Sequence, residues 1–336
     1  MNAARRPLSL LMPAVPGHAR SGCQSVPAND LLLVSCSAVP TSHVLFFPGD
    51  VQNYRAKMAA HRDNFHWQRW SLEDTTELLS RRFPDSFVWL IPASRMHLQK
   101  FSCYDNFVTS NLFGAPKHSS NGHAFEHLLA LLLHGGRQAS RIIKGSAEFS
   151  DFVQEHNGGF STGKSACDAA ATKANDNLRE SASPEKLQTD GAKGSCRIQD
   201  CLFQLPTQLT LVGFSKGCVV LNQLVYELST AQQQPELAAL MHCITDFFWL
   251  DGGHPGGSDT WVTAEEPLRE LGACGATVHV HVSPYQVQDP QRAWIGREQR
   301  RFVRTLHLLG GSVQEKVHFE DEEPSLEKHF RILEEF

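Results

Sequence analysis

The sequence predicts an α/β protein in which a mostly parallel sheet is covered by helices on both faces. Apolar runs of strand length alternate with helix-length amphipathic segments along the 336 residues. The run HVLFF at residues 43–47 is continuously apolar after its histidine, as expected for a buried strand, whereas residues 277–282 alternate Val with His. A third observation is the serine at position 215, which lies between such a run and a helical segment. The length suits one large domain or two small ones.

Six segments have the composition of buried strands and six have helical periodicity. The predicted strands are residues 43–47, 86–91, 209–214, 244–250, 277–282 and 313–319. The predicted helices are residues 71–83, 125–133, 217–228, 264–271, 292–309 and 326–336. Ser71 is expected to cap its helix with Asp74 as partner, and Gly135 with Gly136 is expected to end the second helix.

The chain is expected to hold one domain, residues 41–336, after a leader and linker over residues 1–40. Residues 1–29 contain three arginines and no acidic residue, as in an organelle transit peptide. Four prolines there disfavour the amphipathic helix such a peptide needs, so a disordered tail is the alternative. Residues 137–206 are predicted to be a polar, disordered insertion, because their central part carries almost no large apolar side chains.

The composition argues against nucleic-acid binding, a transmembrane segment and a metal site. The net charge of −5, from 31 basic and 36 acidic residues, argues against a nucleic-acid-binding surface. No run of 18 apolar residues predicts a transmembrane segment. Nine cysteines without a Cys-x-x-Cys motif favour a reducing compartment. The 17 histidines are scattered, so we predict no metal site and no cofactor.

Residues 213–217 read Gly-Phe-Ser-Lys-Gly, a Gly-x-Ser-x-Gly motif. It follows a predicted strand and opens a predicted helix, which is the order of the nucleophile elbow in α/β-hydrolases. The glycines would let helix and strand approach closely, and Ser215 would project above the helix N-terminus. The alternative is an ordinary β–α turn with a capping serine.

A serine nucleophile needs a general base and an acid that orients it. In α/β-hydrolases these follow the serine as acid and then histidine. His329 is the predicted base, because it follows the strand 313–319. Asp289, in the loop after the strand 277–282, is the preferred acid, and Asp251 at the end of the strand 244–250 is the alternative. Asp289 could instead cap the helix that Pro290 begins.

An oxyanion hole needs two backbone N–H groups. Lys216, the residue after the serine, is expected to supply one. Asp50 or Val51, in the turn after the strand 43–47, is expected to supply the other, because Pro48 has no N–H. An inward Asp50 carboxylate would repel a developing oxyanion.

Seven strings resemble the vertebrate chromosome 2 open reading frame 69 family. The resemblance covers about residues 43–135 and 208–336. The strings are HVLFFPGDVQNY (43–54), SRMHLQKFSCYDNF (94–107), NLFGAP (111–116), GFSKGCVVLNQL (213–224), WLDGGHPGGSDTWVT (249–263), VSPYQVQDPQRAWIG (282–296) and the closing EKHFRILEEF.

The resemblance implies an α/β-hydrolase-like protein of the mitochondrion, with a link to glycogen metabolism through the glycogen branching enzyme. Within the mitochondrion, the matrix is the expected location. A cytosolic or secreted protein is the alternative. The family resemblance also implies that Ser215, Asp289 and His329 occupy the positions of a catalytic triad.

The motif and the resemblance lead to two alternative hypotheses for the function. The first is a serine hydrolase that acts on a small-molecule or lipid acyl ester or thioester. The second is a catalytically inactive hydrolase-like protein that binds and regulates a partner enzyme. Asp50 and the glycine-rich block 252–257 favour this second reading.

Overall fold

The computed structural model describes residues 8–19, 25–37, 40–156 and 207–336, without the side chains of residues 144–156. Its centre is an eight-stranded sheet in the order β1-β2-β4-β3-β9-β10-β11-β12. β2 is antiparallel to β1 and β4, and the pairs from β4 to β12 are parallel. This strand order, with its reversed second strand, is an α/β-hydrolase-like sheet, and the predicted fold class is confirmed.

The sheet strands are β1 (Leu8–Pro16), β2 (Ala28–Ser35), β3 (Ser42–Phe47), β4 (Ser86–Leu90), β9 (Leu209–Phe214), β10 (Ile244–Leu250), β11 (Thr277–Val282) and β12 (Val313–Val317). The helices are α1 (Arg55–Ala59), α2 (Leu72–Arg82), α3 (Ala124–His156), α5 (Cys218–Ala231), α6 (Pro235–His242), α7 (Glu265–Ala273), α8 (Pro284–Val287), α9 (Ala293–Leu308) and α10 (Leu326–Glu335). Short 3-10 helices are η1 (Asn64–Trp70), η2 (Ser215–Gly217) and η3 (Pro290–Arg292).

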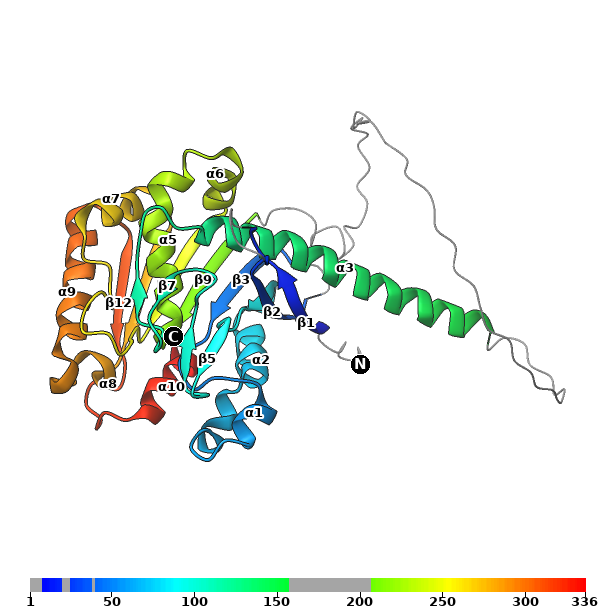
Figure 1. Cartoon of the computed structure of the whole chain (residues 1–336), viewed down its shortest axis with the longest axis horizontal. Coiled ribbons are helices and arrows are strands. Elements are labelled where there is room, and N and C mark those ends of the chain that lie inside the picture. The colour runs from blue at the N-terminus through cyan, green and yellow to red at the C-terminus, as the bar shows by residue number, and fades with distance from the viewer. Residues whose placement is uncertain (1–7, 20–24, 38–39, 157–206) are drawn as a thin grey trace.

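The central strands of the sheet are buried on both faces, and helices cover each face, which gives three layers (Figure 1). In β3, Leu45 and Phe47 face one hydrophobic core, while Val44 and Phe46 face the other. The first core is completed by α3, α5, α7 and α9, and the second by α2, α10 and η1. Side chains alternate across a strand, so an apolar run without polar interruptions fills both cores.

All six predicted strands are present, and each predicted helix has a counterpart. The cap of α2 is also confirmed: Ser71 Oγ accepts the Asp74 N–H at 3.2 Å and donates to the Asp74 carboxylate at 2.5 Å. The first of these bonds satisfies a backbone N–H that the first helical turn leaves unpaired, and the second holds the Ser71 hydroxyl in place.

The expectation of a leader and linker over residues 1–40 is wrong for two segments. Leu8–Pro16 and Ala28–Ser35 are strands of the central sheet and pair with each other from Leu8–Ser35 to Pro16–Ala28. Met12 and Val15 are fully buried. These segments have the composition of a leader, but in the folded protein they are held by strand pairing and by the burial of Met12 and Val15.

The predicted stop at Gly135 is also wrong, since α3 continues to His156 and projects beyond the body of the molecule (Figure 1). A Cβ on Gly135 would lie 2.8 Å from Leu31 and 3.1 Å from Trp89, so this glycine allows close helix packing instead of ending the helix. The insertion therefore begins later than residue 137, and the predicted disorder of residues 157–206 lies outside the described residues.

Two small hairpins lie over the carboxyl ends of the central strands. They are β5 (Arg95–His97) with β6 (Phe101–Cys103), and β7 (Thr109–Ser110) with β8 (Pro116–Lys117). Tyr104 Oη donates to the Pro48 carbonyl at 2.6 Å, and Ser102 Oγ donates to the Gly49 carbonyl at 2.8 Å. These bonds fasten the hairpins to the loop after β3.

Candidate active site

Ser215 lies at the sharp turn between β9 and α5. Its φ is +52°, in the left-handed region that a residue with a side chain rarely occupies. Such strain persists where the surrounding fold holds it, and it is concentrated at functional sites. The predicted strand–turn–helix is therefore present, with the strained backbone of a nucleophile elbow.

The glycines around the serine are set by close packing. A Cβ on Gly217 would meet the Phe47 carbonyl oxygen at 1.8 Å, and one on Gly213 would lie 2.9 Å from the Cys218 backbone. A Cβ on Gly49 would come within 2.7 Å of the Ser215 Cβ. Each site excludes a side chain, because the elbow, α5 and the loop after β3 meet here.

His329 reaches the site from the first turns of α10. Its ring stacks on Phe214 at 4.7 Å and lies 5.2 Å from the ring of Tyr285. Nδ1 forms a 2.6 Å hydrogen bond with Oδ2 of Asp251. This leaves Nε2 as the ring nitrogen that Asp251 does not use, which is the arrangement a general base requires.

Asp251 is fully buried and follows directly after β10. Besides His329, its carboxylate accepts the N–H of Ser283 at 2.7 Å and the Ser283 hydroxyl at 2.6 Å. Its φ is +48°, another left-handed position at a strand end. A buried carboxylate needs such partners, and these also fix its orientation toward the histidine.

The acid that pairs with His329 is thus Asp251, the alternative, and the preference for Asp289 is wrong on geometry. Asp289 accepts the Gln291 N–H at 2.8 Å and pairs with Arg292 at 2.7 Å. Arg292, as hydrogen-bond donor, holds the pKa of Asp289 below its usual value. Asp289 plays the capping part that the sequence analysis kept as the alternative.

Of the two expected donors after β3, Val51 is excluded by its own hydrogen bond. Its N–H donates to the Lys100 carbonyl at 2.7 Å. The backbone N–H of Asp50 and that of Lys216 remain as the candidate oxyanion donors. The Gln52 side chain shapes this turn, since its Oε1 accepts the Gly49 N–H at 2.8 Å and its Nε2 donates to Trp70 and Thr75 at 3.0 Å.

The Asp50 carboxylate is held by neighbouring groups. It accepts the Ser102 N–H at 2.7 Å and lies 3.9 Å from Nζ of Lys216. Burial raises the pKa of Asp50, while Lys216 and the Ser102 hydrogen bond act in the opposite direction. Lys216 is itself fully buried, and burial lowers its pKa. The repulsion expected from Asp50 is therefore reduced by an adjacent cation and a backbone donor.

Ser215 and His329 line one cavity of about 270 Å³, together with Asp50, Phe101, Tyr285 and Arg292. Among the described residues, no hydrogen bond joins the Ser215 hydroxyl to His329. Catalytic hydrogen bonds of ligand-free enzymes are often long and shorten on binding. The cavity therefore holds a serine and an oriented histidine within the same small volume.

Phe101, Tyr285 and Ser283 are site residues that sequence reasoning did not single out. Phe101 belongs to a hairpin whose position above the sheet has no sequence signature. Ser283 had a signal, because it follows β11 directly, as Ser215 follows β9 and Asp251 follows β10. Residues that follow parallel strands meet at one edge of the sheet.

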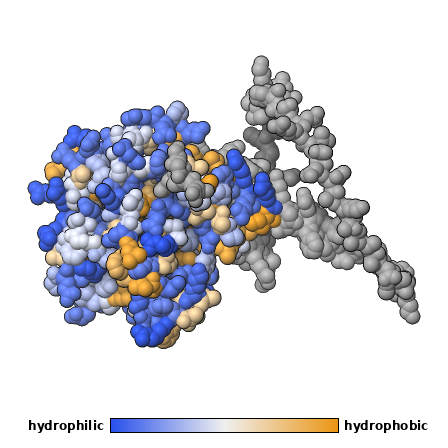
Figure 2. Space-filling model, in the orientation of Figure 1, coloured by the Kyte–Doolittle hydropathy of each residue, from blue (hydrophilic) through white to orange (hydrophobic). Residues whose placement is uncertain are grey.

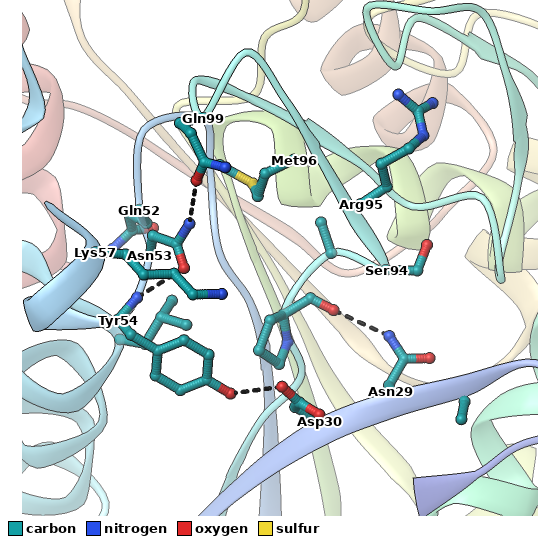
Figure 3. Close-up of a pocket in the computed structure, with 14 residues that line it drawn as sticks. Asn29, Asp30, Gln52, Asn53, Tyr54, Lys57, Ser94, Arg95, Met96 and Gln99 are labelled. Carbon is teal, nitrogen blue, oxygen red and sulfur yellow. Dashed lines mark hydrogen bonds between the residues drawn. The ribbon is translucent and has the colours of Figure 1, made fainter. Parts of the chain in front are cut away.

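A second cavity of about 270 Å³ is lined by Gln52, Asn53 and Tyr54, which lie in the loop after β3 (Figure 3). Several of its polar side chains are hydrogen-bonded to one another. The Tyr54 hydroxyl donates to Asp30 at 3.0 Å, and Asn53 donates to Gln99 at 3.4 Å. Ser215 and His329 do not line this cavity, and the two hydrogen bonds link the loop after β3 to β2 and to the β5–β6 hairpin.

The described residues hold no group of three or more His, Cys, Asp or Glu side chains placed to bind a metal ion. No helix in them has both the length and the apolar character to cross a membrane.

The sequence matches the family model described as C2orf69 over residues 18–311. It is 44% identical over 326 residues to the Mus musculus protein named "Mitochondrial protein C2orf69 homolog", which covers 92% of this chain and 83% of that protein. It is 44% identical over 309 residues to the Homo sapiens "Mitochondrial protein C2orf69", which covers 88% of this chain and 74% of that protein.

Two solved esterases are similar in structure. Esterase Est22 has a TM-score of 0.44 at 10% identity and covers 98% of this chain and 77% of its own. The Tuber melanosporum carboxyl esterase 2 has a TM-score of 0.42 at 9% identity and covers 100% and 83%. These values are too low to assign the activity of either esterase to this chain.

Proposed function

The chain belongs to the C2orf69 family, and we propose that it is a serine hydrolase that cleaves an ester or thioester through an acyl-enzyme on Ser215. The observation that carries the proposal is the 2.6 Å hydrogen bond between Nδ1 of His329 and the buried carboxylate of Asp251. His329 lines the same cavity as the strained Ser215.

In the proposed reaction, Oγ of Ser215 attacks the acyl carbonyl carbon while Nε2 of His329 takes the hydroxyl proton. The backbone N–H groups of Lys216 and Asp50 stabilise the negative charge on the carbonyl oxygen. His329 then gives its proton to the departing alcohol or thiol. Water, activated by the same nitrogen, releases the acid and restores Ser215. Asp251 keeps the tautomer of His329 fixed and stabilises its protonated form.

The test is labelling of the purified full chain with a fluorophosphonate, which phosphonylates activated serines. We expect labelling of the wild type and none above background for Ser215→Ala and His329→Ala. A melting curve of each variant separates loss of reactivity from loss of folding. A folded wild type that resists the reagent would contradict the proposal.

A second candidate is a hydrolase-like binding protein that regulates a partner enzyme. Two observations favour it: the Asp50 carboxylate lines the cavity, and Ser215 is not hydrogen-bonded to His329. The family resemblance suggests the glycogen branching enzyme as the partner to test. Under this candidate Ser215→Ala leaves partner binding intact, and under the first it abolishes function.

We also propose a mitochondrial location. The Mus musculus, Homo sapiens and Danio rerio relatives are all named mitochondrial proteins. Fractionation of cells that express the tagged full chain would test this, and recovery outside mitochondria would contradict it.

A further inference from the structure

Three apolar side chains are exposed on the hairpins above the candidate active site. Leu98 is 64% exposed, Leu112 60% and Phe113 44%. Figure 2 shows an apolar patch on the face where Figure 1 draws the β5–β6 hairpin. Monomeric soluble proteins rarely expose contiguous apolar patches larger than a few hundred Å², and the largest patch of such a protein is often a binding surface.

The turn that presents Leu112 and Phe113 is held rigidly. Oδ1 of Asn111 accepts the N–H groups of Phe113 and Ala115, both at 3.0 Å. Gly114 closes the turn with a φ of +72°, and a Cβ there would lie 2.4 Å from the Ser102 carbonyl oxygen. The apolar side chains are therefore exposed by a well-defined turn that packs against β6.

Two cations hold the backbone of the same turn. Nζ of the buried Lys216 donates to the Phe113 carbonyl at 3.0 Å, and Arg95 donates to the Leu112 carbonyl at 3.2 Å. The carbonyl groups thus face charged donors, and the exposed side chains are left for solvent or ligand. Since Lys216 follows Ser215, the elbow and the apolar turn are joined by one side chain.

Phe101 links the apolar turn to the reactive serine. It lines the cavity with Ser215, and its ring lies 5.6 Å from the ring of Phe113. His97 lies 5.1 Å from Phe113 on the same hairpin surface. An apolar path therefore runs from the cavity across Phe101 to the exposed turn.

The basic residues of the β5–β6 hairpin are paired with carboxylates. Arg95 pairs with Asp105 at 2.9 Å, and Lys100 pairs with Asp63 at 2.6 Å. Their charges are therefore compensated locally, as suits a surface that receives an uncharged chain.

We infer that the substrate of the proposed hydrolase carries a long apolar acyl chain, which leaves the cavity at Phe101 and lies on Leu112 and Phe113. Bound in this way, the chain covers apolar surface that is otherwise exposed to water. This inference rests on the proposed function, because it requires the acyl carbonyl to be at Ser215.

The test compares p-nitrophenyl acetate with p-nitrophenyl octanoate on the full chain. The double variant L112S/F113A should lose about ten-fold or more in kcat/KM for octanoate. Its kcat/KM for acetate should stay within about two-fold of wild type. Leu308→Ser is the matched control, since Leu308 is a 76% exposed leucine on α9, and it should leave both esters unchanged.

A binding measurement separates this inference from the proposed function. Parinaric acid, a fluorescent long-chain fatty acid, is titrated into the Ser215→Ala variant with and without L112S/F113A. We expect the double change to weaken binding about ten-fold or more, even if no ester is hydrolysed by the wild type. Unchanged parinarate affinity, or equal loss on both esters, would overturn the acyl-chain site. Loss of binding to phosphatidylcholine vesicles with unchanged chain-length preference would assign the patch to a membrane instead.

Discussion

At the scale of single residues, Asp251 holds the His329 side chain of the candidate site in place. It is fully buried, and its carboxylate accepts hydrogen bonds from the backbone and hydroxyl of Ser283 while pairing with His329. Asp289 is only part-buried, and its carboxylate forms an ion pair with Arg292. The two carboxylates therefore have different tasks, one in orienting the histidine and one in capping η3.

Exchanging each carboxylate for an amide tests this division. We expect Asp251→Asn to lower the rate of fluorophosphonate labelling about 10³- to 10⁴-fold, because His329 loses its tautomer and its charge partner. Asp289→Asn should label within about two-fold of wild type. Melting curves serve as the folding control. The reverse order of effects would return the acid role to Asp289.

At the scale of elements, an aromatic cluster positions α10 and hence His329. Phe330, which is 1% exposed, lies 4.9 Å from Trp70 and 5.5 Å from Trp67 between ring centroids. Its ring also lies 5.6 Å from Phe214 at the end of β9. Because Phe330 is the next residue, packing of this ring sets where the imidazole of His329 lies.

We expect Phe330→Ala to reduce the free energy of unfolding by about 3–5 kcal/mol, the usual cost of a cavity in place of a buried Phe. Labelling of Ser215 should also slow at temperatures where the variant is folded. Urea denaturation followed by fluorescence gives the first quantity. Phe65→Ala is the control, since Phe65 is 44% exposed, and a similar cost at that position would contradict the argument.

β1 is an edge strand that covers β2 and packs on α3. Deleting residues 1–16 would expose the unpaired edge of β2, which favours aggregation. We expect the truncated chain to melt at lower temperature and to elute partly as aggregate on size exclusion. A chain that lacks residues 1–7 keeps every described strand and should behave as wild type. Equal melting temperatures of the two truncated chains would show that β1 does not stabilise the fold.

At the scale of the whole molecule, buried histidines couple stability to pH. Burial lowers the pKa of His43, His118, His254 and His318 to about 4, and that of His281 to about 3. Trp89 donates its indole N–H to Nδ1 of His43 at 3.0 Å, which requires that nitrogen to be unprotonated. Protons therefore bind the unfolded chain more readily than the folded one.

The sign of the pH effect follows from these pKa values. Above pH 6.5 the histidines are neutral in both states, so their contribution is complete. As pH falls from 6.5 toward 4, the unfolded chain takes up protons first and stability is lost, by up to about 1.4 kcal/mol per pH unit for each histidine. We expect the free energy of unfolding to decrease from pH 7 to 5, and His43→Gln to make that decrease shallower. A variant with the wild-type slope would contradict this.

The sequence by itself determined the alternation of strands and helices, the cap of α2, and the elbow at Ser215. These depend on local periodicity and on turn chemistry, which neighbouring residues carry. His329 could also be proposed from the sequence, because the chain order of hydrolase triads limits where a candidate base can lie. β1 and β2 were missed since their place in the sheet depends on pairing with each other and with β4. α3 was cut short because a glycine that allows close packing resembles a helix stop.

Only the tertiary structure decided which acid meets His329, which N–H groups are free for an oxyanion, and what covers the cavity. Asp251 and Asp289 both follow strands, and their sequence positions do not give the direction of a side chain. Val51 was excluded by a hydrogen bond to Lys100, 49 positions away in the sequence. Contacts between residues so distant in the chain are fixed by packing of the whole domain, and local sequence does not encode them separately.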